Sequence, residues 1–357
     1  MMSITRETVE EKLGGVIDPH TGKSLMKGKS IKDIRVDGDK VSIDIVLGYP
    51  AKSWTPELTK MIQSVVENAD VSVACNTASH EVQEGIKPLA GVKNVIAIAS
   101  GKGGVGKSTL SVNFALALAA EGARVGILDA DIYGPSQPRM LGITGRPKSR
   151  DGKTLEPMTG HQLEAMSIGF LIDEESPMIW RGPMVTQALE QLLNDTQWND
   201  LDYLVVDMPP GTGDIQLTLA QKVPVSGAVI VTTPQDIALL DARKAYKMFE
   251  KVDIPILGVV ENMSTHICSS CGHEEHIFGA GGGRGMAEQY DSEFLGDIPL
   301  DRSIREGADG GCPTVVADPN GVITEKYKAI ARQATAKLAM RKKDFSSKFP
   351  NIVIQQN

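Results

Sequence analysis

The pattern of apolar and polar residues divides the chain into two parts. The first part has the spacing of a small α/β unit, with a helix over 4–13, a hairpin strand over 41–47, a helix that starts at Thr55 and a strand over 71–75. From Val95 onward, short and wholly apolar runs alternate with helical stretches, which predicts a parallel sheet covered on both faces. The predicted strands of this sheet are 95–99, 125–128, 203–206, 228–231 and 256–260, and 294–300 is expected to end it.

A glycine-rich loop follows the first of these runs and opens a helix-forming stretch. The positions of Gly101, Gly106, Lys107 and Ser108 match the phosphate-loop pattern, in which glycines bring backbone N–H groups against phosphate oxygens at the positive end of a helix. Lys107 is expected to hold the β and γ phosphates, and Ser108 is expected to ligate Mg²⁺. The predicted nucleotide-binding residues are Gly101, Lys102, Gly103, Gly104, Val105, Gly106, Lys107, Ser108 and Thr109.

Acidic residues follow two of the predicted strands, at the ends where a parallel sheet binds its ligands. Asp129 and Asp131 come after the 125–128 run and can orient an attacking water or a water bound to magnesium, and the Gly/Pro-rich loop behind them suits a response to the γ phosphate. The alternative is that Asp129 caps the next turn. Asp207 ends the 203–206 run, which is the Walker B arrangement that holds Mg²⁺ through water.

Composition narrows the classes of function. The 357 residues carry a net charge of -8, which gives no general attraction to nucleic acid or to an anionic membrane, although a local basic patch is compatible with it. The four cysteines do not suggest a disulfide framework, and no apolar run is long enough to span a bilayer. The acidic start is unlike a signal or transit peptide. We therefore expect a cytoplasmic protein without a nucleic-acid or membrane partner.

Two domains are predicted from the length and from the change of pattern. The boundaries that we expect are a small α/β domain over 1–80, a charged linker over 81–92, a nucleotide-binding domain over 93–342 and a tail over 343–357. The tail has no continuous amphipathic helix, which argues against attachment to a membrane surface.

Cys268 and Cys271 form a Cys-x-x-Cys pair in a loop well after the phosphate loop. Two thiolates on one tight turn can hold a soft metal or a cluster, but tetrahedral zinc or a cubane cluster usually takes four ligands. The others come either from histidines of the same chain, which would make a zinc site, or from the same cysteines of a second chain. A redox dithiol is a third possibility. The candidate histidines are His266, His273 and His276.

Four further residues are assigned more plainly. Cys75 ends a strand pattern, where burial as a small apolar residue is favoured over metal ligation, and the isolated Cys312 is taken as structural. Trp180 is expected to pack against its neighbours. Arg181, next to it, is expected to contact either a phosphate or a surface carboxylate.

The run from Gly101 to Thr109, with its second lysine, resembles the deviant phosphate loop of a large class of ATPases. The class includes septum-site and chromosome-partitioning ATPases, nitrogenase iron protein and the Mrp/ApbC iron–sulfur carriers. In it the extra lysine reaches across a dimer to the partner's nucleotide. The resemblance implies that Lys102 couples ATP binding to dimerisation, and the alternative is a solvated loop lysine.

The same resemblance assigns roles to other residues. It implies that Lys102, Lys107 and Asp131 are catalytic, with Asp131 positioning water and Asp129 lying nearer to Mg²⁺. It also implies that Asn262 recognises the adenine, because a side-chain amide can both donate to and accept from a base edge. The alternative for Asn262 is a structural cap of a turn.

The stretch from Glu261 to Gly279 closely resembles the Mrp/ApbC family, and the first domain more loosely resembles the iron–sulfur assembly domain that precedes many such ATPases. This implies an α/β fold, a P-loop NTPase of the deviant Walker A class preceded by a small α/β domain. It also implies a homodimer that hydrolyses ATP slowly, binds a labile 4Fe-4S cluster through Cys268 and Cys271, and transfers it to apo iron–sulfur proteins. The rival is a ParA/MinD-like positioning ATPase with zinc in the cysteine loop, and an electron donor like nitrogenase iron protein is disfavoured because its cluster cysteines are spaced differently.

Overall fold

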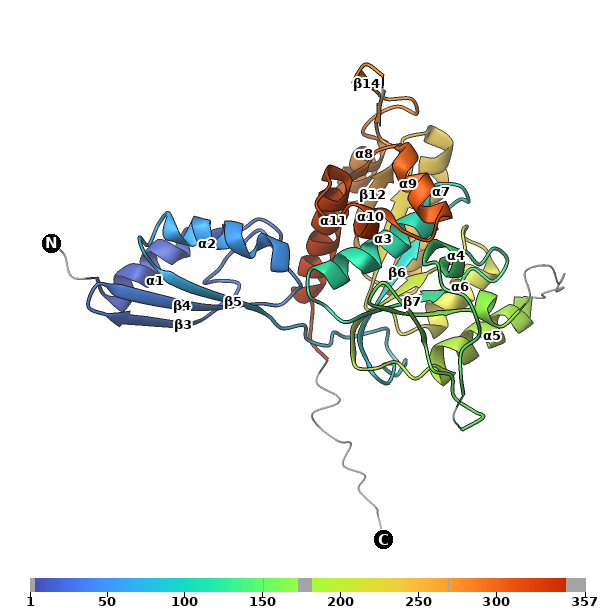
Figure 1. Cartoon of the computed structure of the whole chain (residues 1–357), viewed down its shortest axis with the longest axis horizontal. Helices are drawn as coiled ribbons and strands as arrows, with labels where there is room; N and C mark the ends of the chain where they lie inside the picture. The colour runs from blue at the N-terminus through green and yellow to red at the C-terminus, as the bar shows by residue number, and fades with distance from the viewer. Residues whose placement is uncertain (1–3, 150, 173–181, 269, 345–357) are drawn as a thin grey trace, which may run out of the picture.

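The computed structural model describes residues 4–149, 151–172, 182–268 and 270–344, and it shows a small N-terminal domain beside a larger one (Figure 1). Trp180 and Arg181 lie outside the described residues. Buried apolar side chains form two separate cores, one for each domain. The presence of a small α/β domain before the nucleotide-binding domain is therefore confirmed.

A sheet of eight strands, counted within the described residues, forms the centre of the larger domain in the order β15-β12-β11-β6-β10-β7-β9-β8. Neighbouring strands are parallel except for β8, which pairs antiparallel with β9. The parallel sheet is confirmed, whereas β8 and β9 were not predicted because polar residues such as Thr159 and Glu164 interrupt them. The strands are β6 (Val92–Ala99), β7 (Val125–Asp129), β8 (Met158–Gly160), β9 (Leu163–Ser167), β10 (Leu201–Asp207), β11 (Gly227–Thr232), β12 (Ile256–Asn262) and β15 (Phe294–Ile298).

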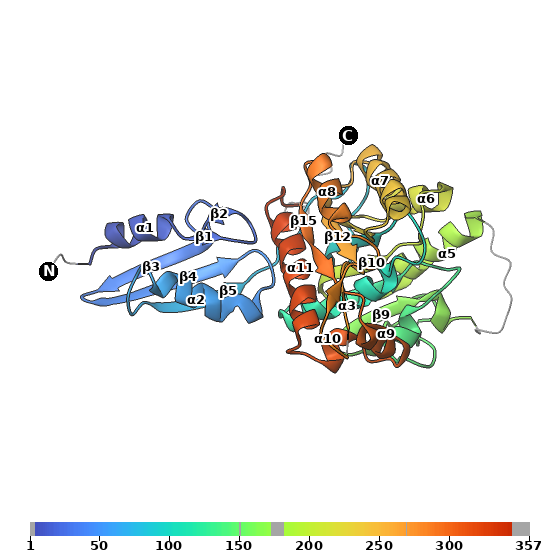
Figure 2. The same cartoon turned by 90° about the horizontal axis from the view of Figure 1, so that it is seen from above.

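Helices flank this sheet (Figure 2). The helix that follows the phosphate loop, α3 (Lys107–Ala120), packs on β6, β7 and β10 and against α11 (Val322–Ala339), which itself packs on β12 and β15. Small residues of α3 such as Ala115 and Ala117 are completely buried. This close packing fixes the position of the loop that precedes α3. The other helices are α4 (Gln137–Met140), α5 (Gly182–Asp195), α6 (Asp214–Lys222), α7 (Asp236–Lys251), α8 (Gly282–Gln289), α9 (Arg302–Asp309) and α10 (Thr314–Ala317).

The N-terminal domain contains a sheet in the order β3-β4-β5, in which β3 and β4 are antiparallel and β4 and β5 are parallel. Alternate residues of β4 are buried, as the polar–apolar alternation predicts. The elements are α1 (Arg6–Gly14), β1 (Ile17–Asp18), β2 (Lys23–Ser24), β3 (Ile31–Asp37), β4 (Lys40–Leu47), α2 (Thr55–Gln63) and β5 (Asp70–Cys75).

The expected burial of Cys75 is wrong. Cys75 is exposed at the end of β5, which is an edge strand and has no buried residue along its length. An apolar strand pattern does not reveal whether the strand lies inside the sheet or at its edge, because both kinds of strand have the same local spacing.

A buried polar cluster joins the two domains. Glu121, directly after α3, accepts hydrogen bonds from the backbone N–H of Ser53 at 2.8 Å and from the Ser53 hydroxyl at 2.5 Å. Arg332 of α11 donates to the same carboxylate at 2.5 Å and to Ser53 Oγ at 2.8 Å. Because these charges are buried and hydrogen-bonded on several sides, they tie the N-terminal domain to the far end of the phosphate-loop helix.

The segment that was expected to be a linker packs along the larger domain. The backbone N–H of Glu81 donates to the carbonyl of Lys342 at 3.2 Å, and Gln83 Nε2 donates to the carbonyl of Ala220 at 2.7 Å. None of the helices in the described parts of the chain combines the length and apolar character needed to cross a bilayer.

Candidate nucleotide site and cysteine hairpin

The phosphate loop leaves the carboxyl end of β6 and enters α3 at Lys107. Two of its glycines are required by their surroundings. Gly106 has a φ of +83°, and a Cβ at this position would lie 2.1 Å from Asn262 Nδ2. A Cβ on Gly101 would lie 1.9 Å from the carbonyl oxygen of Asp241 in α7. The loop is thus left with bare backbone beside the N-terminus of α3, where N–H groups lack intrahelical partners and attract an anion.

Lys107 contacts Asp207, the last residue of β10. Its Nζ lies 2.5 Å from Asp207 Oδ1 and 3.2 Å from Ser108 Oγ. Lys107 is 6% exposed and Asp207 is completely buried. The hydroxyl of Ser111, one turn further along α3, donates to the same Oδ1 at 2.8 Å. These additional hydrogen bonds matter because removing two opposite charges from water is unfavourable unless their remaining polar atoms find partners.

Asp129 ends the neighbouring strand β7 and is completely buried beside Asp207. Burial and the charge of Asp207 raise the pKa of Asp129 to about 7. The carboxylate of Asp129 caps the loop that follows, because backbone N–H groups of that loop donate to it. A contact of Asp129 with magnesium through a water molecule stays a prediction. The donors to this carboxylate are the backbone N–H groups of Asp131 at 3.2 Å, Ser136 at 2.9 Å and Gln137 at 3.1 Å and the hydroxyl of Ser167 at 3.1 Å.

Gln137 belongs to the same cluster and was not predicted from the sequence. Its side chain is 1% exposed, and its Nε2 donates to Asp207 Oδ2 at 2.9 Å and to the carbonyl of Ser108 at 3.1 Å. Its Oε1 is buried and has no hydrogen-bond partner among the described residues. An unpaired buried amide oxygen is unfavourable by about 1–3 kcal/mol, so it marks a place that suits a further donor. The only hint in the sequence was its position in the loop after Asp131.

Asp131 and Lys102 lie at the rim of the site. Asp131 is half-buried, and burial raises its pKa while the nearby charge of Lys107 opposes this rise. Lys102 is exposed and makes no ion pair within the described part of the chain. Of the two lysines in the loop, Lys107 therefore pairs with the buried Asp207, whereas Lys102 lies on the surface.

Asn262 ends β12 and lies against the phosphate loop, where its Nδ2 donates to the carbonyl of Val105 at 2.8 Å. This contact places a side-chain amide beside the nucleotide loop. Its recognition of an adenine stays a prediction.

Cys268 and Cys271 lie in a small hairpin formed by β13 (His266–Ile267) and β14 (Glu274–Glu275), which projects from the larger domain (Figure 1). The turn is closed by two backbone hydrogen bonds, from Cys268 N–H to the carbonyl of His273 at 2.9 Å and from Gly272 N–H to the carbonyl of Cys268 at 2.8 Å. Backbone N–H groups of the turn and the thiol of Cys271 lower the pKa of Cys268. A thiol that ionises readily is suited to bind a metal.

Two of the three candidate histidines near this hairpin use their Nδ1 on a backbone carbonyl. His266 Nδ1 lies 3.1 Å from the carbonyl of Leu300, and His276 Nδ1 lies 2.9 Å from the carbonyl of Ser264. In the parts of the chain that the structure describes, no group of three His, Cys, Asp or Glu side chains is arranged to hold a metal ion. Within these parts, the cysteine pair therefore lacks further ligands from its own chain.

A glycine-rich loop between a parallel strand and a helix, with a buried lysine facing an aspartate on the adjacent strand, defines the class of P-loop NTPases. Comparison with known proteins then identifies the family. A model described as NUBPL iron-transfer P-loop NTPase matches residues 91–335, and a model described as iron-sulfur cluster assembly protein matches residues 6–75. The chain belongs to the family of NUBPL-type iron-transfer P-loop NTPases, which confirms the expected resemblance.

Individual relatives agree with this assignment. An iron-sulfur cluster carrier protein of Pseudomonas fragi is 62% identical over 279 residues, which is 76% of this chain and 97% of the relative. A protein of the same name from Haemophilus influenzae is 51% identical over 90% of this chain and 88% of its own. The solved structure of a nucleotide-binding protein from Archaeoglobus fulgidus in complex with ADP is 38% identical, covers 62% of this chain and 87% of that chain, and has a TM-score of 0.56.

Proposed function

We propose that this chain is an ATP-dependent iron–sulfur cluster carrier that binds a labile 4Fe-4S cluster between two copies of itself and transfers it to apo-proteins. The names of its relatives support the cargo. The observation that carries the proposal is the projecting hairpin with two accessible thiols and, among the described residues, no third ligand beside them. Four thiolates hold a cubane cluster, so two hairpins that meet would complete the set.

Lys107, Ser108 and Asp207 would bind ATP with Mg²⁺. The arrangement fits this pair because a lysine, a hydroxyl and a carboxylate converge beside the bare backbone of the loop. Gln137 supports the fit, since its buried and unpaired Oε1 would accept a hydrogen bond from a water of the metal. When bound, Mg²⁺ neutralises charge on the phosphate oxygens.

ATP binding would require Lys107 to change its partner. In the structure its ammonium group compensates the buried carboxylate of Asp207. Once Lys107 turns to the β and γ phosphates, Asp207 is free to contact the cation site. The exchange would affect Gln137, because its side-chain amide donates a hydrogen bond to Asp207 and its backbone N–H donates one to Asp129. The loop after Asp131 would shift with it, and this would couple nucleotide binding to the dimer interface.

Three further roles complete the proposal. Asp131, at the rim of the site, would orient the attacking water. Lys102 would reach the nucleotide of the partner subunit, for which its exposed position is suited. Asn262 would contact the adenine from its place against the loop. Free cysteines that bind a cluster would stay reduced in the cytoplasm, which is the compartment that we propose.

Anaerobic reconstitution with iron and sulfide tests the proposal on the full chain. We expect a broad charge-transfer band in the visible spectrum and about four irons per dimer. Cys268→Ser and Cys271→Ser should each abolish the band and leave ATP hydrolysis intact. Cys312→Ser is the matched control, because this free cysteine lies outside the hairpin and should keep the full iron content.

Other outcomes would contradict the proposal. Unchanged iron loading in Cys268→Ser would exclude the hairpin as the cluster site. Stoichiometric zinc without a charge-transfer band would favour the positioning ATPase with structural zinc. A cluster-loaded protein that light scattering shows to be a monomer would rule out binding between two copies.

A further inference from the structure

A basic cleft lies where the two domains meet. It has a volume of about 400 Å³, within the usual range of ligand sites, and none of the phosphate-loop residues lines it. Its walls come from the N-terminal domain, from the segment that follows β5 and from the end of α11 with the residues after it. No Asp or Glu is among the described residues that line it, whereas the lysines that do are Lys23, Lys27, Lys29, Lys32 and Lys343. We call it the lysine cleft.

The five lysines of the cleft have no ion-pair partner in the described part of the chain. All five are exposed. The ammonium group of Lys32 donates a hydrogen bond to the carbonyl of Lys29 at 2.9 Å. Elsewhere, lysines of the same chain pair with carboxylates, as Lys326 does with Asp297 at 2.8 Å. Like charges that converge on one concave surface raise the local positive potential, which attracts an anion even though the chain as a whole is acidic.

His80 provides a second sign of a missing ligand in this cleft. It lines the cleft and is 3% exposed. Its Nδ1 donates to Asn94 Oδ1 at 2.9 Å, because the amide nitrogen of Asn94 is already used on the carbonyl of Ala78. With Nδ1 as the donor, Nε2 is an acceptor that is buried without a hydrogen-bond partner among the described residues, and it suits a donor such as the backbone N–H of a peptide. Burial lowers the pKa of His80, and the charge of Lys343 lowers it further.

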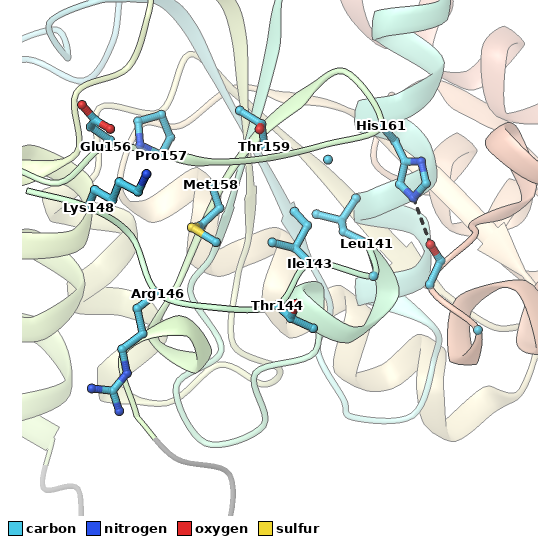
Figure 3. A pocket seen from close by; sticks show the side chains of 14 residues that line it. Leu141, Ile143, Thr144, Arg146, Lys148, Glu156, Pro157, Met158, Thr159 and His161 are labelled. Carbon is cyan, nitrogen blue, oxygen red and sulfur yellow. Dashed lines mark hydrogen bonds between the residues drawn. The ribbon is translucent and has the colours of Figure 1, made fainter.

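A larger pocket elsewhere shows what is distinctive about the lysine cleft. This pocket, of about 770 Å³, lies beyond α4 and is lined by Arg146 and Lys148 together with Glu156 (Figure 3). Its histidine, His161, has its Nε2 bonded to the carbonyl of Gly311 at 2.9 Å (Figure 3). The lining of that pocket includes a carboxylate and its ring nitrogen has a partner, so it has neither the wholly cationic charge nor the unpartnered ring nitrogen of the lysine cleft.

The shape and lining of the cleft favour one kind of anion. Apolar groups from Val46, Ala78, Ala339 and Met340 line it beside the lysines, which suits a peptide that carries both carboxylates and small side chains. A concave cleft is not accessible to a flat membrane surface. A nucleic acid would extend beyond the cleft across a protein of net charge -8, which would repel it.

We propose that the lysine cleft binds a short segment rich in Asp and Glu on a partner protein. The cleft would hold the partner by the edge of the N-terminal domain, apart from the nucleotide site and from the cysteine hairpin. Docking at this place would leave both cysteines accessible during the contact. This binding is independent of whether the hairpin holds a cluster, so the two proposals can fail separately.

Fluorescence anisotropy tests the proposal with the full chain and a labelled peptide of alternating Glu and Ala. We expect binding at low ionic strength that weakens as salt is added, and no binding of the matching Gln/Ala peptide. Lys27→Glu combined with Lys29→Glu should weaken binding at least about tenfold. The matched control is Lys12→Glu with Lys60→Glu, which changes the net charge equally at exposed sites of the same domain outside the cleft and should alter affinity less than about twofold.

Several results would overturn the proposal. An equal loss of affinity in both double variants would show that only net charge matters. Absence of peptide binding at low salt, or tighter binding of pyrophosphate or an oligothymidylate than of the peptide, would exclude an acidic segment as the occupant. Lys23→Gln combined with Lys32→Gln gives a second pair for the same test, and thermal unfolding with ATP hydrolysis shows whether each variant is folded.

Discussion

The phosphate-loop site and the cysteine hairpin differ in how deeply they are buried and in how many contacts fix them. Lys107 and Asp207 are buried, and Ser111 and Gln137 add hydrogen bonds to the same carboxylate. The hairpin consists of two strands of two residues each, and its turn is closed by two backbone hydrogen bonds. One site is assembled inside a single packed core, whereas the other projects into solvent.

The difference fits the role that we propose for each site. A site for a charged nucleotide gains from burial, because charges interact more strongly away from water and fixed partners hold them in place. A site that takes up and releases a cargo gains from exposure and from few packing contacts, because elements of this kind open and rearrange most easily. The predictions below test this contrast, mainly through the free energy of unfolding.

Lys107→Met should have the largest effect on stability. Loss of the ammonium group leaves the carboxylate of Asp207 buried beside Asp129, and removing one partner of such a pair costs about 3–5 kcal/mol. Urea unfolding of the nucleotide-free protein measures it. Lys102→Met, the same change at the exposed lysine of the loop, should alter the free energy of unfolding by less than about 0.5 kcal/mol. Equal effects of the two variants would contradict the contrast.

The buried Asp129 should make stability depend on pH. Its pKa is about 7 in the folded protein and 3.8 as a reference for the unfolded chain, so the folded state binds more protons between these values. Its contribution to stability is complete below pH 4 and is lost as the pH rises to about 7. Unfolding should therefore become easier over this window in the wild type than in Asp129→Asn. An equal loss in the two proteins would show that Asp129 is ionised throughout this window.

Gln137→Leu should weaken nucleotide binding about fivefold when Mg²⁺ is present, because the variant loses the acceptor for a metal-bound water, a hydrogen bond of about 1 kcal/mol. Titration with a fluorescent ADP analogue measures the affinity, and in EDTA the two proteins should differ little. Gln197→Leu, at an exposed amide outside the site, is the matched control. A loss that is equal with and without Mg²⁺ would assign Gln137 to the fold alone.

Cys268→Ser should have the smallest effect on stability although it removes the proposed cluster site. The thiol lies on a projecting turn, so the free energy of unfolding should change by less than about 0.5 kcal/mol. Thermal and urea unfolding of the cluster-free protein check this. Destabilisation by several kcal/mol would show that the hairpin is part of the packed structure, which would remove the contrast with the phosphate loop.

Much of the fold could be predicted because its signals are local. The five apolar runs named in the larger domain are strands of one parallel sheet, and the run over 294–300 holds β15 at its end. Period and composition report such elements well, since side-chain burial in a covered parallel sheet needs no partner from a specific position in the chain. The strands β8 and β9 were not predicted because they are short and contain both polar and apolar residues.

The candidate site was predictable only in part. Lys107, Asp207 and the cysteine pair belong to motifs whose spacing follows from the geometry of one turn or one strand end. Ser111 and Gln137 belong to no such motif, and they reach Asp207 only because α3 and the start of α4 come together beside β10. Cys75 was misjudged for a related reason, since the order of strands in a sheet decides which strand is at its edge.

The sequence by itself determined the class of the larger domain, the place of the phosphate loop and the pair of thiols. Tertiary structure alone decided how the two domains meet, and with it the contact of Ser53 with Glu121 and Arg332 and the lysine cleft. The reason is physical. Local spacing controls backbone geometry over a few residues, whereas a cleft lined by Lys27 and Lys343 exists only once the packing of whole domains has brought distant segments together.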